Sequence, residues 1–197
     1  MHANSSIPLQ FDSVNMLAFW LHTHQIDIVH WGQANAKTVD DLWQELMLGE
    51  CRLQDYPVMR LVDVTNVLVQ QKGLLLREVG QELRNGRVRH RDSLPAEKML
   101  PGEDALTTAR RCLSEELNLT DSAICSDFAL VMTQFKQKDS PSYPGLPSCF
   151  TIHTVKVQVQ GLPVEAFSTF NAAYEKGDPV RVHHWRWQES HAQHERP

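Results

Sequence analysis

A turn followed by a helical pattern in the middle of the chain constrains the fold more than any other feature. The stretch LPGEDALTTARRCLSEELNL covers residues 100–119, and its Pro101-Gly102 pair marks a turn directly before the pattern. On a helix, positions 112, 115 and 116 are spaced i, i+3 and i+4 and therefore share one face. Glu115 and Glu116 place two adjacent carboxylates on that face, shortly after Arg111.

Acidic side chains on one helix face suit a hard divalent cation. Mg²⁺ keeps several of its waters, so one or two carboxylates plus substrate phosphates are enough to bind it. Arg111, one residue before this face, is placed to orient a carboxylate or to contact a substrate. The alternative is structural, because adjacent glutamates on helices are commonly just solvated.

Extended patterns lie on both sides of the predicted helix. Residues 58–69 are rich in β-branched residues and predict a strand. Residues 73–83 and 86–92 flank Asn85-Gly86, a dipeptide typical of a hairpin turn. Further strands are expected at 127–135, 149–159 and 179–187, with loops at 93–104 and 136–148. One helix inserted among many strands predicts an α+β fold with a mixed sheet.

The first 55 residues are expected to form an arm ahead of this body. Residues 26–32 predict a strand, whereas residues 1–24 show no clear periodicity. A helix is expected after Thr38, which can cap it together with Asp41 three residues later, and Gly49 is a suitable stop. Its apolar residues recur at i, i+3, i+4 and i+7 and are Val39, Leu42, Trp43 and Leu46. The predicted division is an arm at 1–55, a main domain at 56–188 and a polar tail at 189–197.

The arm also gathers three tryptophans, Trp20, Trp31 and Trp43. We expect them to pack against the main domain or against a partner chain, which leaves a homodimer or a protein partner as an alternative. Stacking on a nucleobase is a further alternative.

Composition narrows the class of protein. The formal net charge of -5 argues against broad nucleic-acid binding, which depends on releasing counterions from phosphates. The four cysteines are scattered without a CxxC pair, so neither a paired-thiolate zinc site nor a disulfide framework is expected. No signal peptide and no apolar stretch of membrane-spanning length is recognisable. The expectation is a soluble, cytoplasmic protein that makes no membrane contact.

The stretch from residue 97 to residue 119 resembles the signature box of the Nudix hydrolase superfamily. That box reads G, five residues, E, seven residues, R-E-U-x-E-E-x-G-U, where U is bulky and apolar. Matching positions are Glu103, Arg111, Leu113, Glu115, Glu116 and Leu119. Three positions depart from it: Glu97 stands for the first glycine, Cys112 for the first glutamate after the arginine, and Asn118 for the last glycine.

The resemblance implies a Nudix-like mixed sheet with the box helix packed on it, and cleavage of a diphosphate bond in a nucleoside diphosphate linked to a moiety X. It implies that Glu115 and Glu116 bind Mg²⁺, with Mn²⁺ as a substitute, and that Arg111 and Glu103 brace the box. Glu97 lies in the same loop and is a candidate replacement for the carboxylate missing at Cys112, as a metal ligand, as a base or beside the substrate. A neutral thiol replaces neither a carboxylate ligand nor a base. The alternative is therefore a catalytically impaired domain that needs no metal and binds a nucleotide-like ligand or a protein partner.

Two other groups of residues are candidates. Arg87, Arg89 and Arg91 alternate along one strand, so their side chains point to one face and suit substrate phosphates beside the box. The alternative is an ordinary solvated hairpin face. Among the ten histidines no HExxH spacing occurs, and a metal site made of histidines is not expected. The alternation breaks near His184 and Trp185, which indicates a bulge and a pocket that these two residues line.

Overall fold

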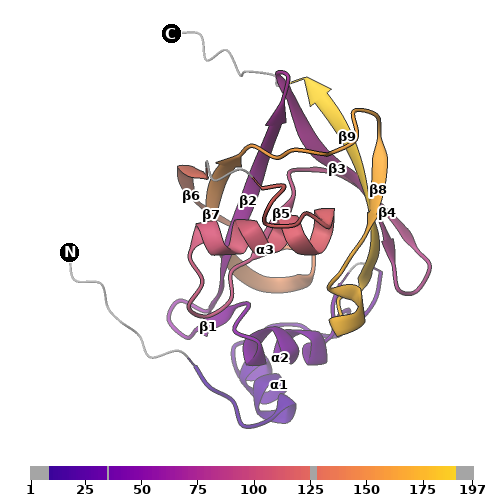
Figure 1. The fold of residues 1–197 in the computed structure, drawn as a ribbon. Coiled ribbons are helices and arrows are strands. Elements are labelled where there is room, and N and C mark those ends of the chain that lie inside the picture. The colour runs from indigo at the N-terminus through magenta and orange to yellow at the C-terminus, as the bar shows by residue number, and fades with distance from the viewer. Residues whose placement is uncertain (1–8, 35, 125–127, 190–197) are drawn as a thin grey trace, which may run out of the picture. The chain divides into compact units, whose positions relative to one another are not determined.

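The computed structural model describes residues 9–34, 36–124 and 128–189. Its helices are α1 (Val14–Thr23), α2 (Val39–Met47) and α3 (Ala105–Leu117), with a 3-10 turn at Tyr174–Lys176 (Figure 1). The strands are β1 (Arg52–Gln54), β2 (Met59–Gln71), β3 (Leu74–Leu83), β4 (Val88–Ser93), β5 (Ala96–Lys98), β6 (Ala129–Ser140), β7 (Tyr143–Val157), β8 (Phe167–Phe170) and β9 (Val180–Glu189). In the part of the chain just given, no helix is long and apolar enough to cross a bilayer.

The strands form one mixed sheet, as predicted for an α+β fold. Its main order is β6-β7-β2-β3-β9-β8, with β1 and β5 paired to β2 and β4 paired to β3. By their contacts the residues divide into two compact units. Unit 1 comprises 1–64, 98–102 and 134–152, and unit 2 comprises 65–97, 103–133 and 153–197, each with a core of its own.

Unit 1 is built around α1 and α2. The prediction for α2 is confirmed, because the Thr38 hydroxyl accepts the Asp41 N–H and the Asp41 carboxylate accepts the Thr38 N–H. The apolar face of α2 packs in a core with Leu17, Leu21 and Tyr143. All three arm tryptophans belong to this core or pack against it. Core packing is thus their use in the structure, while a homodimer through the arm remains a prediction.

Three predictions in unit 1 are wrong. Residues 26–32 are not a strand, because the Asp27 carboxylate accepts the Val29 N–H and starts a run of turns. Residues 14–23 form α1, for which no periodicity was recognised, and Ser13 caps it by accepting the Met16 N–H. The loop expected at 136–148 instead belongs to β6 and β7, which turn at residues 141–142.

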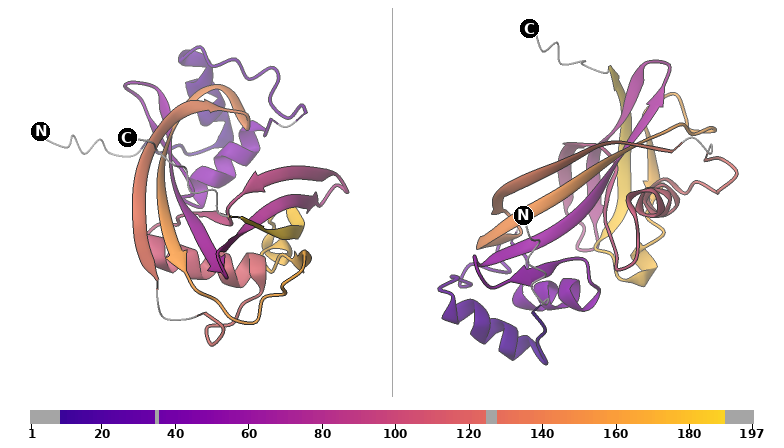
Figure 2. Two further views of the ribbon diagram at one scale, coloured as in Figure 1. Left: turned by 90° about the horizontal axis from the view of Figure 1, so that it is seen from above. Right: turned by 90° about the vertical axis from the view of Figure 1, so that its left-hand side faces the viewer.

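Unit 2 contains the box helix. In Figures 1 and 2, α3 lies on one face of the strands of this unit. Its inward residues are Ala105, Ala109, Cys112, Leu113 and Leu117. They pack with Val67 and Val69 of β2, Leu76 of β3, Val155 and Val157 of β7, and Trp185 of β9. The helix is therefore anchored to the sheet along one face, and Glu116 is buried on this side with Cys112.

The hairpin at Asn85-Gly86 is confirmed, and β3 pairs with β4 and with β9 in antiparallel register. Gly86 takes a φ of 79°, and the Leu83 N–H donates to the Arg87 carbonyl over 2.8 Å. In the pairing of β3 with β9 the register shifts by one residue between Glu78 and Gly80, so Val79 is bulged there. In the pairing with β4 the shift at the same place puts the extra residue on β4, between His90 and Ser93. A register shift lies beside His184 and Trp185, where a bulge was expected, but its extra residue is on β3 and not on the strand 179–187 for which the bulge was predicted. Strands β5 and β8 were not predicted.

Candidate active site

Both ends of the box helix are fixed by specific contacts. Asp104 caps the start, because its carboxylate accepts the Thr107 N–H over 2.7 Å. Asn118 ends the helix with a φ of 54°, the left-handed conformation that the usual glycine adopts easily. In the last turn the Glu115 carbonyl accepts the Ala172 N–H over 2.8 Å. Asn118 therefore replaces the box glycine without altering how the helix ends.

Arg111 holds the loop of the box against the helix. Its Nε donates to Glu103 Oε1 over 2.8 Å and its Nη2 donates to Glu103 Oε2 over 3.0 Å. Its Nη1 lies 3.4 Å from Glu115 Oε2 and 3.7 Å from Glu97 Oε2. Burial alone would lower the pKa of Arg111, but the hydrogen bonds to Glu103 and the charges of Glu97, Glu103 and Glu115 raise it overall. The two hydrogen bonds between Arg111 and Glu103 are contacts of the kind that the resemblance implies for residues that brace the box.

Glu115 and Glu116 have different surroundings. Glu115 is held by Arg111 and by Lys176, whose Nζ lies 3.1 Å from Glu115 Oε1. Glu116 is 8% exposed. Burial raises the pKa of Glu116, the charges of Glu97 and Glu78 raise it further, and Arg91 offsets only part of this. The ionised form of Glu116 is therefore disfavoured unless another cation joins it.

Cys112 is completely buried in the core of unit 2. Burial raises the pKa of its thiol, and the charges of Glu116 and Glu97 raise it further, so the thiol is neutral at physiological pH. Glu97, on β5, is half-buried and supplies a carboxylate charge that acts on Cys112 and on Glu116. Strand β5 thus brings a carboxylate to 3.7 Å from the Arg111 Nη1 on the helix from which the box glutamate is missing.

The sequence of this box resembles the signature box of Nudix hydrolases at the six positions given above. No protein-family model matches the chain, and no curated protein matches it either. Among solved structures, a Nudix hydrolase from Nitrosomonas europaea has a TM-score of 0.38 at 16% identity, covering 65% of this chain and 72% of its own. An Ap4A hydrolase from C. elegans has a TM-score of 0.37 at 17% identity, covering 66% and 80%. The protein DR0079 from Deinococcus radiodurans has a TM-score of 0.38 at 16% identity, covering 65% and 67%. Likeness at this level assigns no activity to this chain.

The Nudix-like box has the chemistry for Mg²⁺ shared with a ligand, although not for a metal held by the protein alone. Within the described ranges, no three His, Cys, Asp or Glu side chains are placed to hold a metal ion together. Mg²⁺ does not need such a set when phosphate oxygens complete its shell. Glu97 and Glu116 place two carboxylates where repulsion already disfavours ionisation, and a cation between them would relieve it.

Two of the three predicted arginines lie beside buried polar residues. Arg89 donates through Nε to Gln81 Oε1 over 3.0 Å, and the Arg91 Nε lies 2.8 Å from Glu78 Oε2. Arg87 is exposed at the end of the turn before β4. Arg91 also acts on Glu116 electrostatically, which relates the strand arginines to the box. A solvated hairpin face, the alternative for this group, describes Arg87 but not Arg91.

Sequence reasoning did not find Glu78, Gln81 or the role of His183. Glu78 and His183 are nearly fully buried, and Glu78 Oε1 lies 2.6 Å from His183 Nδ1. These residues are 105 positions apart in the sequence, and the pairing of β3 with β9 brings them together. Gly80 within the strand pattern was the available signal, since an interior glycine often marks a bulge.

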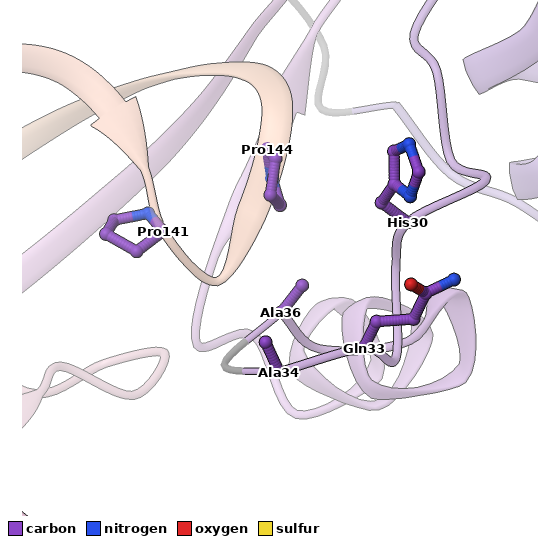
Figure 3. A pocket seen from close by; sticks show the side chains of 6 residues that line it. All are labelled: His30, Gln33, Ala34, Ala36, Pro141 and Pro144. Atoms are coloured by element: carbon purple, nitrogen blue, oxygen red, sulfur yellow. The ribbon is translucent and has the colours of Figure 1, made fainter.

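The part of the chain that the structure describes has two further cavities. None of the predicted catalytic, metal or substrate residues lines the first, and Arg91 lines the second. The first, in unit 1, holds about 360 Å³ and is shown in Figure 3, lined by His30, Gln33, Ala34, Ala36, Pro141 and Pro144. The second, in unit 2, holds about 470 Å³ and is lined by Val79, Gly80, Val88, His90, Arg91, His184, Arg186 and Gln188. His184 thus lines a pocket as predicted, whereas Trp185 lies in the core.

Proposed function

We propose that this protein hydrolyses a diphosphate bond in a small molecule, of the nucleoside diphosphate linked to X type, with the help of Mg²⁺. The observation that carries the proposal is the placement of Glu97, whose charge acts on Cys112 and Glu116 and whose Oε2 lies 3.7 Å from the Arg111 Nη1. In this proposal the carboxylate of Glu97, on β5, takes the part of the one that Cys112 removes from the helix.

In this proposal Glu116 and Glu97 hold the metal together with the substrate phosphates. Glu115 would complete the set when Lys176, one of the two cations that engage its carboxylate, turns toward the phosphates, while Arg111 stays paired with Glu103. Bound Mg²⁺ neutralises phosphate charge and polarises water. Arg111 and Glu103 keep the loop and the helix together, so that the carboxylate of Glu97 faces the helix.

The arginines of β4 supply the positive charge that a diphosphate needs. Arg89 and Arg91 both reach Gln81 Oε1, over 3.0 Å from the Arg89 Nε and 3.5 Å from the Arg91 Nη1. Arg91 also pairs through its Nε with Glu78, and the donors of the two guanidinium groups that Gln81 and Glu78 do not engage would bind phosphate oxygens, which arginine binds through paired hydrogen bonds. Arg87, exposed at the turn, would extend this contact.

The second candidate function is binding without turnover. It is favoured by the neutral, fully buried thiol of Cys112 and by the engagement of Glu115 with two cations. A domain of this kind would keep the shape of the Nudix-like box and bind a nucleotide-like ligand or a protein partner. It would have no requirement for a metal.

Phosphate release from a panel of nucleoside diphosphate derivatives, with and without Mg²⁺, separates the two functions. Wild type, Glu116→Gln, Glu97→Gln and Cys112→Glu are compared. Hydrolysis predicts Mg²⁺-dependent release by wild type that falls at least about 100-fold in Glu116→Gln and in Glu97→Gln. Release absent from wild type but present in Cys112→Glu would instead identify a site that has lost catalysis and kept binding.

A further inference from the structure

A buried polar cluster lies on the sheet within unit 2, and Glu78 is at its centre. Its Oε1 accepts the Gln81 Nε2 N–H over 2.6 Å and lies 2.6 Å from His183 Nδ1. Its Oε2 lies 2.8 Å from the Arg91 Nε. Glu78, Gln81 and His183 are each 5% exposed or less. Burying so many polar groups opposes stability unless every one is paired, so such a cluster is expected to serve the site rather than the core.

The bulge at Val79 is what assembles this cluster. Without it, Glu78 and Gln81 would point to opposite faces, because side chains alternate along a strand. The extra residue brings both to one face, where Gln81 pairs in register with Arg89 on β4 and with His183 on β9. Bulges next to active sites often re-aim a side chain in this way.

The neighbouring position on the same strands faces the other way. Gly80 pairs with His184, whose Nδ1 lies 2.7 Å from the Ser168 hydroxyl. His183 and His184 are therefore adjacent in sequence and opposite in direction. His184 thus supplies a matched control for His183.

His183 has one nitrogen that the protein does not pair. Its side chain is 2% exposed and stacks on Trp185, with ring centroids 5.5 Å apart. Among the described residues, no hydrogen-bond partner meets its Nε2. Glu78, paired with Arg91, is a carboxylate that only accepts, so Nδ1 carries a proton toward it, and in the tautomer protonated at Nδ1 the Nε2 is an acceptor.

We propose that His183 is a substrate-site residue whose Nε2 accepts a hydrogen bond from an O–H group, either a water or a hydroxyl of the moiety X. This inference rests on the proposed function and deepens it, with Glu78 as the positioning residue that fixes the ring. If the O–H belongs to water, Nε2 takes its proton while the oxygen bonds to phosphorus and the bond from phosphorus to the leaving phosphate oxygen breaks. His183 would then supply the base that Cys112 cannot be.

The test compares His183→Asn, His183→Gln and His184→Asn in the full chain. Asparagine keeps a donor near the Nδ1 position toward Glu78 but removes the outer nitrogen. Glutamine places an amide near the Nε2 position, where its oxygen accepts a hydrogen bond but cannot act as a useful base. Thermal unfolding of all three variants checks that they fold. The substrate is ADP-ribose, which carries hydroxyls, and inorganic pyrophosphate is the probe without them.

A water partner predicts a kcat lowered about 10²–10⁴-fold in both His183 variants, with KM and the fold intact. A substrate hydroxyl predicts a KM for ADP-ribose raised about tenfold in His183→Asn, restored in His183→Gln, and unchanged binding of pyrophosphate. In either case His184→Asn, on the opposite face of β9, changes kcat and the KM for ADP-ribose by less than His183→Asn does. If both His183 variants match His184→Asn while Glu116→Gln is inactive, the inference fails and the proposed function stands.

Wild type without turnover would remove the proposed function, and the inference then depends on binding. Calorimetry with ADP-ribose would show weaker binding by His183→Asn than by His184→Asn. Equal affinities, or no binding by any of the proteins, would overturn the assignment of His183.

Discussion

Arg111 and Glu103 are joined by two parallel hydrogen bonds, from Nε to Oε1 over 2.8 Å and from Nη2 to Oε2 over 3.0 Å. Paired contacts of this kind fix direction as well as distance. Arg111 is on α3 and Glu103 is in the loop before it, so the pair sets the angle at which the loop meets the helix. The Nη1 of the same guanidinium lies 3.7 Å from the Oε2 of Glu97, so the carboxylate that β5 carries faces the box helix.

Replacing Glu103 by glutamine should loosen the box. The glutamine amide keeps one acceptor oxygen but loses the negative charge. Arg111, whose side chain is only 21% exposed, then loses one of its two hydrogen bonds to this position. We expect a loss of about 1–3 kcal/mol in the free energy of unfolding, measured by urea denaturation. Asp92→Asn is the control, since its carboxylate pairs with Arg77 while 68% exposed, and should change stability by less than about 1 kcal/mol. Equal losses in the two variants would contradict the role given to Glu103.

The box was predictable because its information is local. Helix periodicity, a turn, a capping aspartate and a left-handed end residue all lie between residues 101 and 118. Spacing along a helix converts directly into a shared face. What spacing does not give is the surroundings of each carboxylate, so the difference between Glu115, held by two cations, and the buried Glu116 needed the structure.

The predictions for residues 14–23 and 136–148 were wrong for identifiable reasons. α1 has apolar residues on nearly every side, with Phe19 72% exposed and Leu17 fully buried, so no clean period appears. Ser13 as a cap was the signal that could have found it. The loop expected at 136–148 rested on its prolines and glycine, yet Tyr143 and Leu146 are fully buried and hold this stretch in β7. Burial by distant elements overrode the local breakers.

The His183 cluster shows where sequence reasoning ends. Residues 73–83 were predicted as one extended run, but a one-residue bulge within a strand reverses the direction of every side chain that follows it. Glu78 and His183 can only be brought together by knowing both the register and the bulge. Pairing across 105 residues leaves no local pattern to detect.

Glu45 in unit 1 should make stability depend on pH in the acid range. Its carboxylate contacts Arg60, Lys37 at 2.7 Å and Lys98 at 2.9 Å. Burial opposes the ionised form, but the charges of Lys98, Arg60 and Lys37 outweigh it and lower the pKa of Glu45. The unfolded chain then takes up the proton first, near pH 4.3, so the contribution is full above that value and is lost as pH falls toward the lowered pKa.

Urea denaturation of wild type and Glu45→Gln between pH 7 and pH 3 measures this contribution. At pH 7 we expect the variant to be less stable by about 3–5 kcal/mol, because three cations lose their shared partner. The gap should narrow as pH falls below about 4.3. Asp40→Asn on the same helix is the exposed control and should shift stability by less than about 1 kcal/mol at every pH. A gap that stays constant with pH would refute the ionic role.

Asn118 offers a test of how the box helix ends. Its φ of 54° strains a residue with a Cβ, and its Nδ2 donates to the Phe170 carbonyl over 2.9 Å. Asn118→Ala should lower the free energy of unfolding by about 1–2 kcal/mol. Alanine tolerates the left-handed conformation less well than asparagine, and it cannot make the hydrogen bond to Phe170. Asn118→Gly loses only the bond and should stay within about 1 kcal/mol of wild type. Thermal unfolding that ranked alanine above glycine would show that the conformation does not limit stability here.

Glu116→Gln should stabilise the protein when no metal is present, although it is expected to abolish hydrolysis. The raised pKa of Glu116 means that its contribution is full below about pH 4.3 and is lost as pH rises through the raised value. Glutamine keeps the shape without the charge, so at pH 8 with a chelator the variant should exceed wild type by about 1–3 kcal/mol. Adding Mg²⁺ together with a non-hydrolysable nucleoside diphosphate, whose phosphates complete the shell of the metal, should stabilise wild type by about 1.4 kcal/mol for each tenfold excess over Kd and should stabilise the variant less. The exposed Glu165→Gln serves as control. A wild type more stable than Glu116→Gln at pH 8 in chelator would show that the buried carboxyl is already neutralised by the protein, and Mg²⁺ would then have no part in this site.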